Sequence, residues 1–435
     1  MATDEAVPAG HHLLSVAASE RASEGLGNFV VTLGDRTHVV WQDVSATGYS
    51  ACVRTLDRTQ GTWSPTVVLG KGVDNHARPC IAADSDGGLH VIIGGHNTPF
   101  QYTRSVRPND SSEWTKPVAF GVGTYPCLVA GPGNVLYLTG RPKPQAGVDL
   151  YTKAPDGAWK LTQPLILQRE EKYRAGYAGY NTILAWGPGQ KRLHFACDVY
   201  EGRGSAGKLL GENQAVVYMV SDDGGKTWRK ADGTAIAGER FPKSLDVLGL
   251  NCHERIGEKP PPVLRLGGMV VDAQDRPVVL YTSDEPERAQ LHLVRPDAAG
   301  KWQDLGLGAA LAQHAPGHGA IGPRGGLSLG AGGAIYACLP IAPLADFPPP
   351  GLPGLKRESI RYVWVASMDD GKTYQWREPF PQPAGRETHT PNLERPTGYN
   401  VVPAARAPAF IYYMGLARYA AKGEVIQNRL YFVQP

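Results

Sequence analysis

Four side chains with acid, base or cationic chemistry flank two consecutive pairs of predicted strands. His76 and His96 stand at the outer ends of the first pair, and Tyr125 and Arg141 stand at the outer ends of the second. In an antiparallel hairpin the start of one strand lies beside the end of the next, so we expect each pair of residues to be neighbours. Two imidazoles, a phenol and a guanidinium at one edge could bind an acidic sugar and move its protons.

Both pairs of strands are marked by apolar runs around a tight turn. The first pair runs through residues 76–84 and 89–96, around Ser85-Asp-Gly-Gly. The second pair runs through residues 125–130 and 135–141, around Gly131-Pro-Gly-Asn. Gly, Pro, Asn and Asp are the residues that turns require, so both segments are predicted to be β-hairpins.

The composition indicates a β protein that binds neither nucleic acid nor membrane. The 435 residues include 53 Gly and 36 Pro, and no long stretch has the apolar period of an amphipathic helix. The net charge is only +3, and no basic run would follow a phosphate backbone. No apolar run is long enough to cross a bilayer.

One strand-like element recurs seven times along the chain. Most copies follow a polar or Gly-rich turn, and several precede a Trp-bearing segment. The copies begin at His38, Leu89, Val135, Leu193, Pro277, Ala334 and Pro408. Four strands per unit around an axis make a propeller blade, so we predict an all-β, seven-bladed β-propeller. We expect one domain over residues 1–435, with insertions at about 233–262 and 340–356 and a closing strand near residues 13–18 that pairs into the last blade.

Two further turns carry the pattern S-x-D-x-G-x-T-[WY], which resembles the Asp box of sialidase-like propellers. The copies run from Ser221 to Trp228 and from Ser367 to Tyr374. In that motif the Ser and Asp side chains bond the backbone of their own turn, and Gly supplies a positive φ. The acids Asp223 and Asp369 are therefore predicted to be structural and not catalytic.

The cysteines and the strand histidines are predicted to be packing residues. Six cysteines are scattered without any CxxC pair, which favours buried free thiols. His194, Cys197, Cys252 and His253 could supply four zinc ligands, but His194 occupies the same repeat position as His90 and His38. No metal is assigned, although a structural ion is left open.

The chemistry that fits the four residues is β-elimination on a uronic acid, which needs no cofactor. A guanidinium beside the carboxylate stabilises the charge that develops as the C5 proton leaves, and Arg141 is predicted to supply it. His76 and Tyr125 are the predicted acid and base, in either order, because the assignment depends on the sugar epimer. His96 is predicted to orient or assist.

Further residues near this edge are predicted to contact the substrate. Asn75 precedes His76, and Arg78 follows it where a guanidinium could reach a carboxylate. An aromatic segment with one arginine, residues 173–180, contributes Arg174 and Tyr177, which suit stacking on sugar rings. Asn181 occupies the equivalent edge of the fourth blade.

The chain resembles the BNR-repeat seven-bladed propellers that include ulvan lyases and related rhamnose-glucuronate lyases. The resemblance rests on residues 74–76, 84–91, 95–105, 124–126 and 140–141, and it covers most of the chain between about Val30 and Pro242. It implies a polysaccharide lyase with His76, His96, Tyr125 and Arg141 as its site. The family often follows Asn-His with Tyr-Gly, whereas this chain has Ala77-Arg78, which predicts a more cationic pocket and a different uronate polymer or an exo-acting enzyme.

Two alternatives remain open at this point. A sialidase-like exo-glycosidase would need paired carboxylates or a Tyr/Glu nucleophile, and Asp198 is the one plausible acid near the site. A non-catalytic carbohydrate-binding propeller would keep Arg141 and the aromatic residues without needing His76 and Tyr125 together. We expect a monomer acting on an acidic polysaccharide, secreted or periplasmic, with a cytoplasmic location as the alternative.

Overall fold

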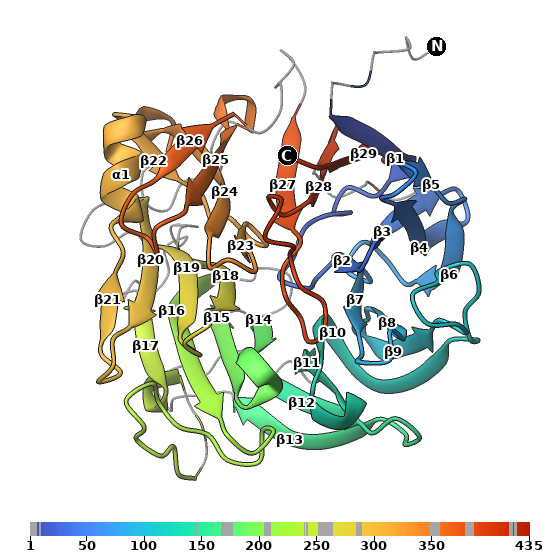
Figure 1. Cartoon of the computed structure of the whole chain (residues 1–435), viewed down its shortest axis with the longest axis horizontal. Helices are drawn as coiled ribbons and strands as arrows, with labels where there is room; N and C mark the ends of the chain where they lie inside the picture. Colours follow the sequence, from blue (N-terminus) through green and yellow to red (C-terminus); the bar gives the residue numbers. More distant parts are fainter. Residues whose placement is uncertain are drawn as a thin grey trace.

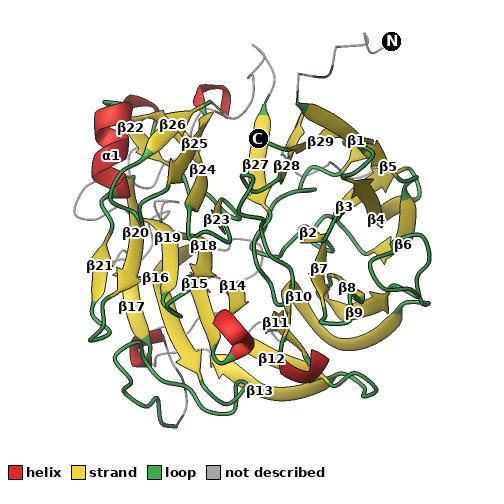
Figure 2. Cartoon of the chain, viewed as in Figure 1, coloured by secondary structure: helices red, strands yellow, loops and turns green. Residues whose placement is uncertain are grey.

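The computed structural model of the chain consists almost entirely of strands and loops. It describes residues 7, 10–143, 147–166, 177–203, 210–238, 240, 242–250, 264–283, 289–347, 357–378, 387–416, 421 and 424–435. Within these ranges the one α-helix is α1 (Leu307–His314), and the rest of the helical structure is single 3₁₀ turns (Figure 2). These turns are η1 (Pro132–Asn134), η2 (Pro188–Gln190), η3 (Pro242–Ser244), η4 (Leu344–Asp346) and η5 (Arg357–Ser359). The predicted all-β class is confirmed.

The strands follow one another around a common centre in chain order. In Figure 1 the colours pass from blue on the right, through green at the bottom and yellow on the left, to red at the top. In the part of the chain that is described, backbone hydrogen bonds join these strands into five antiparallel sheets.

The two ends of the chain share the first of these sheets. Its strands are β1 (His11–Ala18), β2 (Val30–Leu33), β3 (Arg36–Ser45), β4 (Gly48–Asp57), β5 (Thr62–Trp63), β6 (Val67–Gly72), β27 (Thr388–Leu393), β28 (Phe410–Met414) and β29 (Asn428–Val433). β1 pairs with β29, with Leu13 opposite Tyr431 and Ser15 opposite Leu430. The predicted closing strand is therefore confirmed.

The second sheet contains both hairpins that carry the candidate residues. Its strands are β7 (Pro79–Ala83), β8 (Leu89–Ile93), β9 (His96–Arg104), β10 (Val118–Ala130), β11 (Leu136–Pro142), β12 (Val148–Lys153) and β13 (Lys160–Ile166). The long strand β10 pairs with β9 through residues 118–124 and with β11 through residues 123–130. Two units that the sequence predicted to be separate blades are thus joined in one sheet.

Three smaller sheets complete the described part of the chain. One contains β14 (Tyr177–Trp186), β15 (Leu193–Arg203), β16 (Leu210–Ser221) and β17 (Asp246–Leu250). The next contains β18 (Arg265–Val271), β19 (Pro277–Ser283), β20 (Gln290–Pro296) and β21 (Trp302–Asp304). The last contains β22 (His318–Ala320), β23 (Leu327–Leu329), β24 (Ile335–Pro343), β25 (Arg361–Ser367) and β26 (Gln375–Arg377).

All seven copies of the predicted repeat form strands inside these sheets. They are β3, β8, β11, β15, β19, β24 and β28. β7 and β8 are buried at every residue, which explains why they read as continuous apolar runs and not as an alternating pattern. The turn between them is closed by Asp84, whose Oδ1 accepts hydrogen bonds from the amides of Asp86 and Gly88 at 3.0 and 2.6 Å.

The core lies between neighbouring sheets and contains the described cysteines. Large aromatic side chains such as Trp41, Phe195 and Trp364 are at most 2% exposed. Five cysteines are buried free thiols, as predicted: Cys52, Cys80, Cys127, Cys197 and Cys338. Cys252 lies outside the described residues. Among these residues no helix is long and apolar enough to cross a membrane.

Both predicted insertions contain regular structure. In the segment 233–262, residues 246–250 form β17, the outer strand that pairs with β16. In the segment 340–356, residues 340–343 are the end of β24, which pairs with β25, and η4 follows directly. The sequence predicted these segments only as insertions into the repeat, and β17 and the end of β24 lie within them. Residues 251–263 and 348–356 lie outside the described residues.

The closing strand β1 should contribute to stability through its buried face. Leu14 is 5% exposed and packs in the core against β3 and β29, whereas Val16 on the other face is 61% exposed. We expect Leu14→Ala to lower the free energy of unfolding by about 2 to 4 kcal/mol, because it leaves a cavity. The matched Val16→Ala should change it by less than about 0.5 kcal/mol. Equal effects in urea titrations would show that β1 packs differently.

Candidate active site

The two histidines that the sequence placed side by side are stacked on each other. The ring centroids of His76 and His96 are 3.8 Å apart, with an angle of 23° between the planes. His76 lies in the turn before β7, and His96 is the first residue of β9. Gly95 allows the chain to approach closely here, because a Cβ at that position would lie 2.4 Å from the carbonyl oxygen of Thr98.

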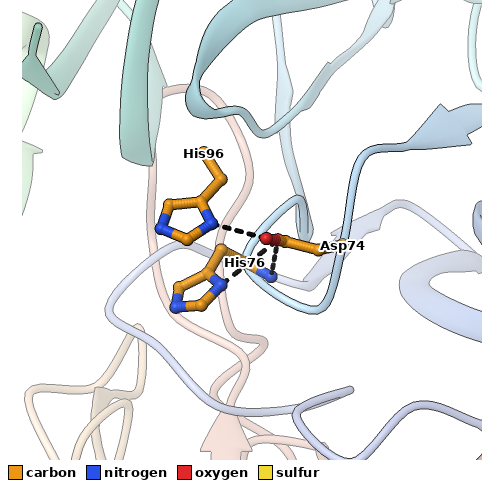
Figure 3. Close-up of side chains that lie close together, drawn as sticks. All are labelled: Asp74, His76 and His96. Atoms are coloured by element: carbon orange, nitrogen blue, oxygen red, sulfur yellow. Dashed lines mark hydrogen bonds and ion pairs between the residues drawn. The ribbon is translucent and has the colours of Figure 1, made fainter. Parts of the chain in front are cut away.

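The carboxylate of Asp74 accepts hydrogen bonds from the imidazole rings of both His76 and His96. Asp74 accepts a hydrogen bond from His76 Nδ1 at 3.2 Å on one oxygen and from His96 Nδ1 at 2.5 Å on the other (Figure 3). The amide of His76 also donates to Asp74, at 2.8 Å, which fixes the turn. Since a carboxylate only accepts, both Nδ1 atoms carry the proton, and a neutral ring then keeps Nε2 as an acceptor. Figure 3 shows both Nε2 atoms directed away from Asp74.

The surroundings keep His76 neutral and Asp74 ionised. Burial lowers the pKa of His76 from its ordinary value, although the hydrogen bond to Asp74 opposes this shift. Burial alone would raise the pKa of Asp74, but the hydrogen bonds from the two histidines outweigh it and hold the pKa well below its usual range. A neutral imidazole near pH 7 can accept a proton.

Tyr125 adopts a strained backbone conformation beside these rings. Its φ is 58°, and it lies where the pairing of β10 with β11 is interrupted between Thr124 and Cys127. Tyrosine rarely has a positive φ, and a residue before proline normally has an extended backbone, so neighbouring contacts must maintain this conformation. The ring centroid of Tyr125 is 6.0 Å from that of His76. β10 begins at Val118, so Tyr125 does not start the strand as predicted.

Two guanidiniums face the ring of Tyr125. The Cζ atom of Arg141 is 5.0 Å from the ring centroid, and that of Arg78 is 5.7 Å from it. Arg141 donates to Thr124 Oγ1 at 3.0 Å and to Asn97 Oδ1 at 3.3 Å, and it is 1% exposed. Arg141 is thus buried more deeply than an arginine at a strand end would suggest. In this conformation its charge acts beside Tyr125 and not at the surface.

Arg78 belongs to an ionic cluster that the sequence did not reveal. Glu24 pairs with Arg21 at 2.7 Å, with Arg324 at 3.4 Å and with Arg78 at 4.0 Å. Burial and the nearby Arg21 lower the pKa of Arg78 to about 10, so it remains protonated at neutral pH. Arg324 also lies 3.8 Å from Asp198, so three guanidiniums meet two carboxylates, and the local excess of positive charge favours an anionic ligand.

A small cavity joins this cluster to Tyr125. Its volume is about 20 Å³, close to that of a single water molecule, and its lining includes Glu24, Arg78, Tyr125, Asn181 and Thr182. The cavity is too small for a sugar.

The structure places the other residues that were predicted to contact the substrate in different surroundings. Asn181 lines the cavity, but its side chain donates to Asp198 at 3.0 Å. Asn75 is 5% exposed and donates to Glu20 at 2.7 Å, which stabilises the turn before His76. Arg174 and the side chain of Tyr177 lie outside the described residues.

The acid that a glycosidase would need is fully buried. Asp198 has no exposed surface; one of its oxygens accepts from Asn181, and the other accepts from the amide of Leu266 at 3.4 Å and lies 3.8 Å from Arg324. The acids of the two S-x-D-x-G-x-T turns are also engaged: Asp223 accepts from the amide of Thr227 at 2.8 Å, and Asp369 from that of Thr373 at 2.9 Å. None of these carboxylates is placed to attack a sugar.

The zinc ligands considered from the sequence do not come together in the described residues. Both ring nitrogens of His194 are bonded, Nδ1 to Tyr218 at 2.8 Å and Nε2 to Asp275 at 3.3 Å. Cys252 and His253 lie outside the described residues. In the described ranges, the group of three potential ligands that meet is Asp74, His76 and His96, whose atoms lie within 4.8 Å of one another. The hydrogen bonds to Asp74 account for this approach.

Sequence reasoning named the two histidines but missed their shared acceptor. Asp74 carries a recognisable signal, since an acid two residues before a histidine can bond the amide of that histidine in a turn. No local sequence pattern indicates the ionic cluster of Glu24, Arg21 and Arg324. Glu24 and Arg324 are 300 residues apart in the sequence and meet only in the fold.

Comparisons with known proteins identify a protein family and solved structures of similar fold. The model of a BNR repeat-containing family matches residues 36–308. No curated protein matches the sequence. Among solved structures, a polysaccharide lyase of family PL25, an ulvan lyase, has a TM-score of 0.65 at 14% identity, and the match covers 97% of this chain and 96% of that one.

Two further structures agree with this likeness. The PL25 ulvan lyase bound to -[GlcA(1-4)Rha3S]- has a TM-score of 0.64 at 13% identity, covering 97% of this chain and 96% of that one. The polysaccharide lyase Uly1 has a TM-score of 0.56 at 10% identity, covering 99% and 94%. At sequence identities this low, the structural similarity shows a shared fold and nothing more.

The shared carboxylate makes a prediction about the two imidazoles. In histidine NMR titrations we expect His76 to have a pKa below 6.5 and a proton on Nδ1. Asp74→Asn should lower the pKa of His76 further, because the carboxylate favours the imidazolium. The pKa of His194, whose ring nitrogens bond to Tyr218 and Asp275, should not change in this variant, and this residue serves as the control. An unchanged or raised pKa of His76 in the variant would contradict the arrangement.

Proposed function

The chain belongs to the BNR repeat-containing family, and we propose that it is a polysaccharide lyase that cleaves a uronic-acid-containing polysaccharide by β-elimination. The main support is the meeting of two stacked imidazoles, a tyrosine and two guanidiniums at one edge of a sheet. Elimination needs a base, an acid and a positive charge, and this group contains all three. The similarity in fold to polysaccharide lyases is consistent with it.

In the proposed reaction His76 is the base and Tyr125 is the acid. His76 Nε2 takes the proton from C5 of the uronate, the bond between C4 and the glycosidic oxygen breaks, and a double bond forms between C4 and C5. The Tyr125 hydroxyl gives its proton to the departing oxygen. The lowered pKa of His76 supports the base role, because the ring is neutral and ready to accept a proton at pH 7.

Arg141 and Arg78 stabilise the charge that develops on the uronate carboxylate. Both guanidiniums lie within 6 Å of the Tyr125 ring and are nearly buried, where a charge acts more strongly than in water. Direct contact between Arg141 and a carboxylate would require the groups around Tyr125 to move when the substrate binds.

Asp74 and His96 position the base. Asp74 accepts from Nδ1 of both rings, which sets the tautomer that leaves Nε2 of His76 free of a proton. His96 stacks on His76 and limits the rotation of its ring. Asp74 is therefore a positioning residue that acts through His76.

We propose that the fold is a single-domain, seven-bladed propeller over residues 1–435. The seven repeat strands would each be the second strand of a blade, and the pairing of β1 with β29 would close the ring between its two ends. The order of the strands around the centre in Figure 1 supports this arrangement.

The proposed substrate is a uronate polymer other than ulvan, or a chain end in an exo-acting enzyme. Arg78 replaces the glycine that often occupies this position in ulvan lyases, and it lies against Tyr125, where it would add charge and remove space. A polymer of this kind is met outside the cytoplasm, so we propose a secreted or periplasmic enzyme that acts as a monomer.

A substrate screen tests the proposed activity. The purified protein is incubated with ulvan, glucuronate-capped arabinogalactans and glycosaminoglycans, and the ultraviolet absorbance of the new conjugated double bond is followed. A rise in absorbance on any of these polymers is the expected result. New reducing ends without the absorbance would indicate hydrolysis, and no change with retained binding would indicate a carbohydrate-binding propeller; either outcome rejects the lyase.

Variants of the base and the acid should lose turnover and keep the fold. We expect His76→Ala and Tyr125→Phe each to lower kcat by about 10²- to 10⁴-fold, because each removes one proton transfer. The melting temperature should change little. Tyr137→Phe is the matched control, since Tyr137 lies in β11 and packs on Trp186. Full turnover in both site variants would exclude the proposed mechanism.

The pH profile should reflect the environment of His76. Since only the neutral ring is a base, kcat/KM should fall as the pH drops through the pKa of His76, with its midpoint below pH 6.5. Asp74→Asn should move this midpoint to still lower pH. It should also lower the maximum value of kcat/KM, because the carboxylate no longer fixes the proton of His76 on Nδ1. Asp86→Asn, in the turn before β8, should do neither. A midpoint that does not move in Asp74→Asn would remove Asp74 from the mechanism.

A further inference from the structure

A second group of reactive side chains crosses three consecutive strands far from the first site. Ser283 ends β19, His292 lies in β20 and Asp304 ends β21. The Ser283 hydroxyl is 2.9 Å from His292 Nε2, and His292 Nδ1 is 3.0 Å from Asp304 Oδ2. In Figure 1 this sheet lies on the left, whereas β7 to β9 lie on the right.

The direction of these hydrogen bonds is set by chemistry. The carboxylate of Asp304 only accepts, so His292 Nδ1 donates to it. A neutral ring then has an unprotonated Nε2, which accepts from the hydroxyl of Ser283. The ring is held by Tyr281, whose ring stacks on it with centroids 4.7 Å apart and 18° between the planes. A serine, a histidine and an acid in this order form the arrangement that activates serine as a nucleophile.

Other strand histidines have similar hydrogen bonds but are almost completely buried. They belong to the second-strand repeat, and their partners are a threonine or tyrosine hydroxyl and an Asp or Asn side chain. These residues are His38, His90 and His194. Their side chains are almost completely buried, whereas that of His292 is 18% exposed and lines a cavity. His292 is on a third strand, where the repeat does not require a histidine.

The cavity beside His292 can accept a small molecule. Its volume is about 410 Å³, and its apolar walls include Leu291, Leu311 and Leu344. His292 and Asp304 also line it, whereas Ser283 is 5% exposed and lies behind His292, so an ester must reach Ser283 Oγ past the His292 ring. The described lining contains no lysine or arginine, which favours an uncharged ligand.

The first turn of α1 contributes backbone donors to the same cavity. Gly308 and Ala309 line it, and their amides have no acceptor within the helix because they belong to its first turn. A helix N-terminus favours negative charge, such as the oxygen of a tetrahedral intermediate. Asp304 Oδ1 accepts from the amide of Gly306 at 2.8 Å, so one carboxylate orients His292 and also fixes the start of the helix.

We propose that Ser283, His292 and Asp304 form a second active site, which hydrolyses a short-chain carboxylic ester such as an O-acetyl group. Ser283 Oγ bonds to the ester carbonyl carbon as its proton passes to His292 Nε2. The carbon–oxygen bond of the ester breaks, and the departing alkoxide takes that proton. Water then gives a proton to His292 and attacks the acyl-serine; the acid leaves, and the proton returns to Ser283.

Covalent labelling of the full-length protein tests this site. The protein is treated with a fluorophosphonate, which reacts with activated serines, and the modified peptide is identified by mass spectrometry. Turnover of p-nitrophenyl acetate is measured in parallel. We expect the label on Ser283, its loss in Ser283→Ala, and labelling and ester turnover slower by at least about 10²-fold in His292→Ala.

Control measurements separate this result from loss of folding. Ser105→Ala removes another buried serine hydroxyl, one that accepts from the amide of Leu89, and it should change neither labelling nor turnover. Melting temperatures of all variants are compared with that of the wild type. Absence of the label from Ser283 in the wild-type protein, or ester turnover retained in a folded Ser283→Ala variant, would overturn the proposal.

Discussion

The candidate site depends on the pairing of a single residue in β10. Thr124 pairs with His96 in β9 on one side and with Arg141 in β11 on the other. Its hydroxyl accepts from Arg141 and from the amide of Asn97, which follows His96. Because a strand has only two neighbours, this pairing brings the ends of two hairpins to one place. The interruption of the pairing directly after Thr124 then turns the ring of Tyr125 toward His76 and the two guanidiniums.

Buried charges determine the chemical state of this group. Asp74 is ionised because two imidazoles donate to it, and its bond to the neutral His76 ring leaves the outer nitrogen of that ring without a proton. On the other side of Tyr125, Glu24 and Asp198 balance only part of the charge of three arginines. The result is a neutral base beside a positive region, which is the combination that removal of a proton next to a carboxylate requires.

Much of the molecule uses the same residue types for stability alone. His90 is bonded by both ring nitrogens, to Tyr102 and Asp84, and is 6% exposed. Asp223 bonds its own turn, and Asp198 is fully buried. What distinguishes His76 and His292 from His90 is therefore not residue type or hydrogen bonding but adjacent space or charge, which only the packing of other strands provides.

The sequence by itself determined the all-β class, the seven repeat strands and the neighbours within each hairpin, because turns and strand periodicity act over a few residues. His76 next to His96, and Tyr125 next to Arg141, follow from such local pairing. Only the tertiary structure decided that the two pairs meet, that Arg141 is buried, and that Glu24 contacts Arg324. These features depend on how β10 is shared between hairpins and on contacts between residues hundreds of positions apart, where no local pattern of side chains specifies the partner.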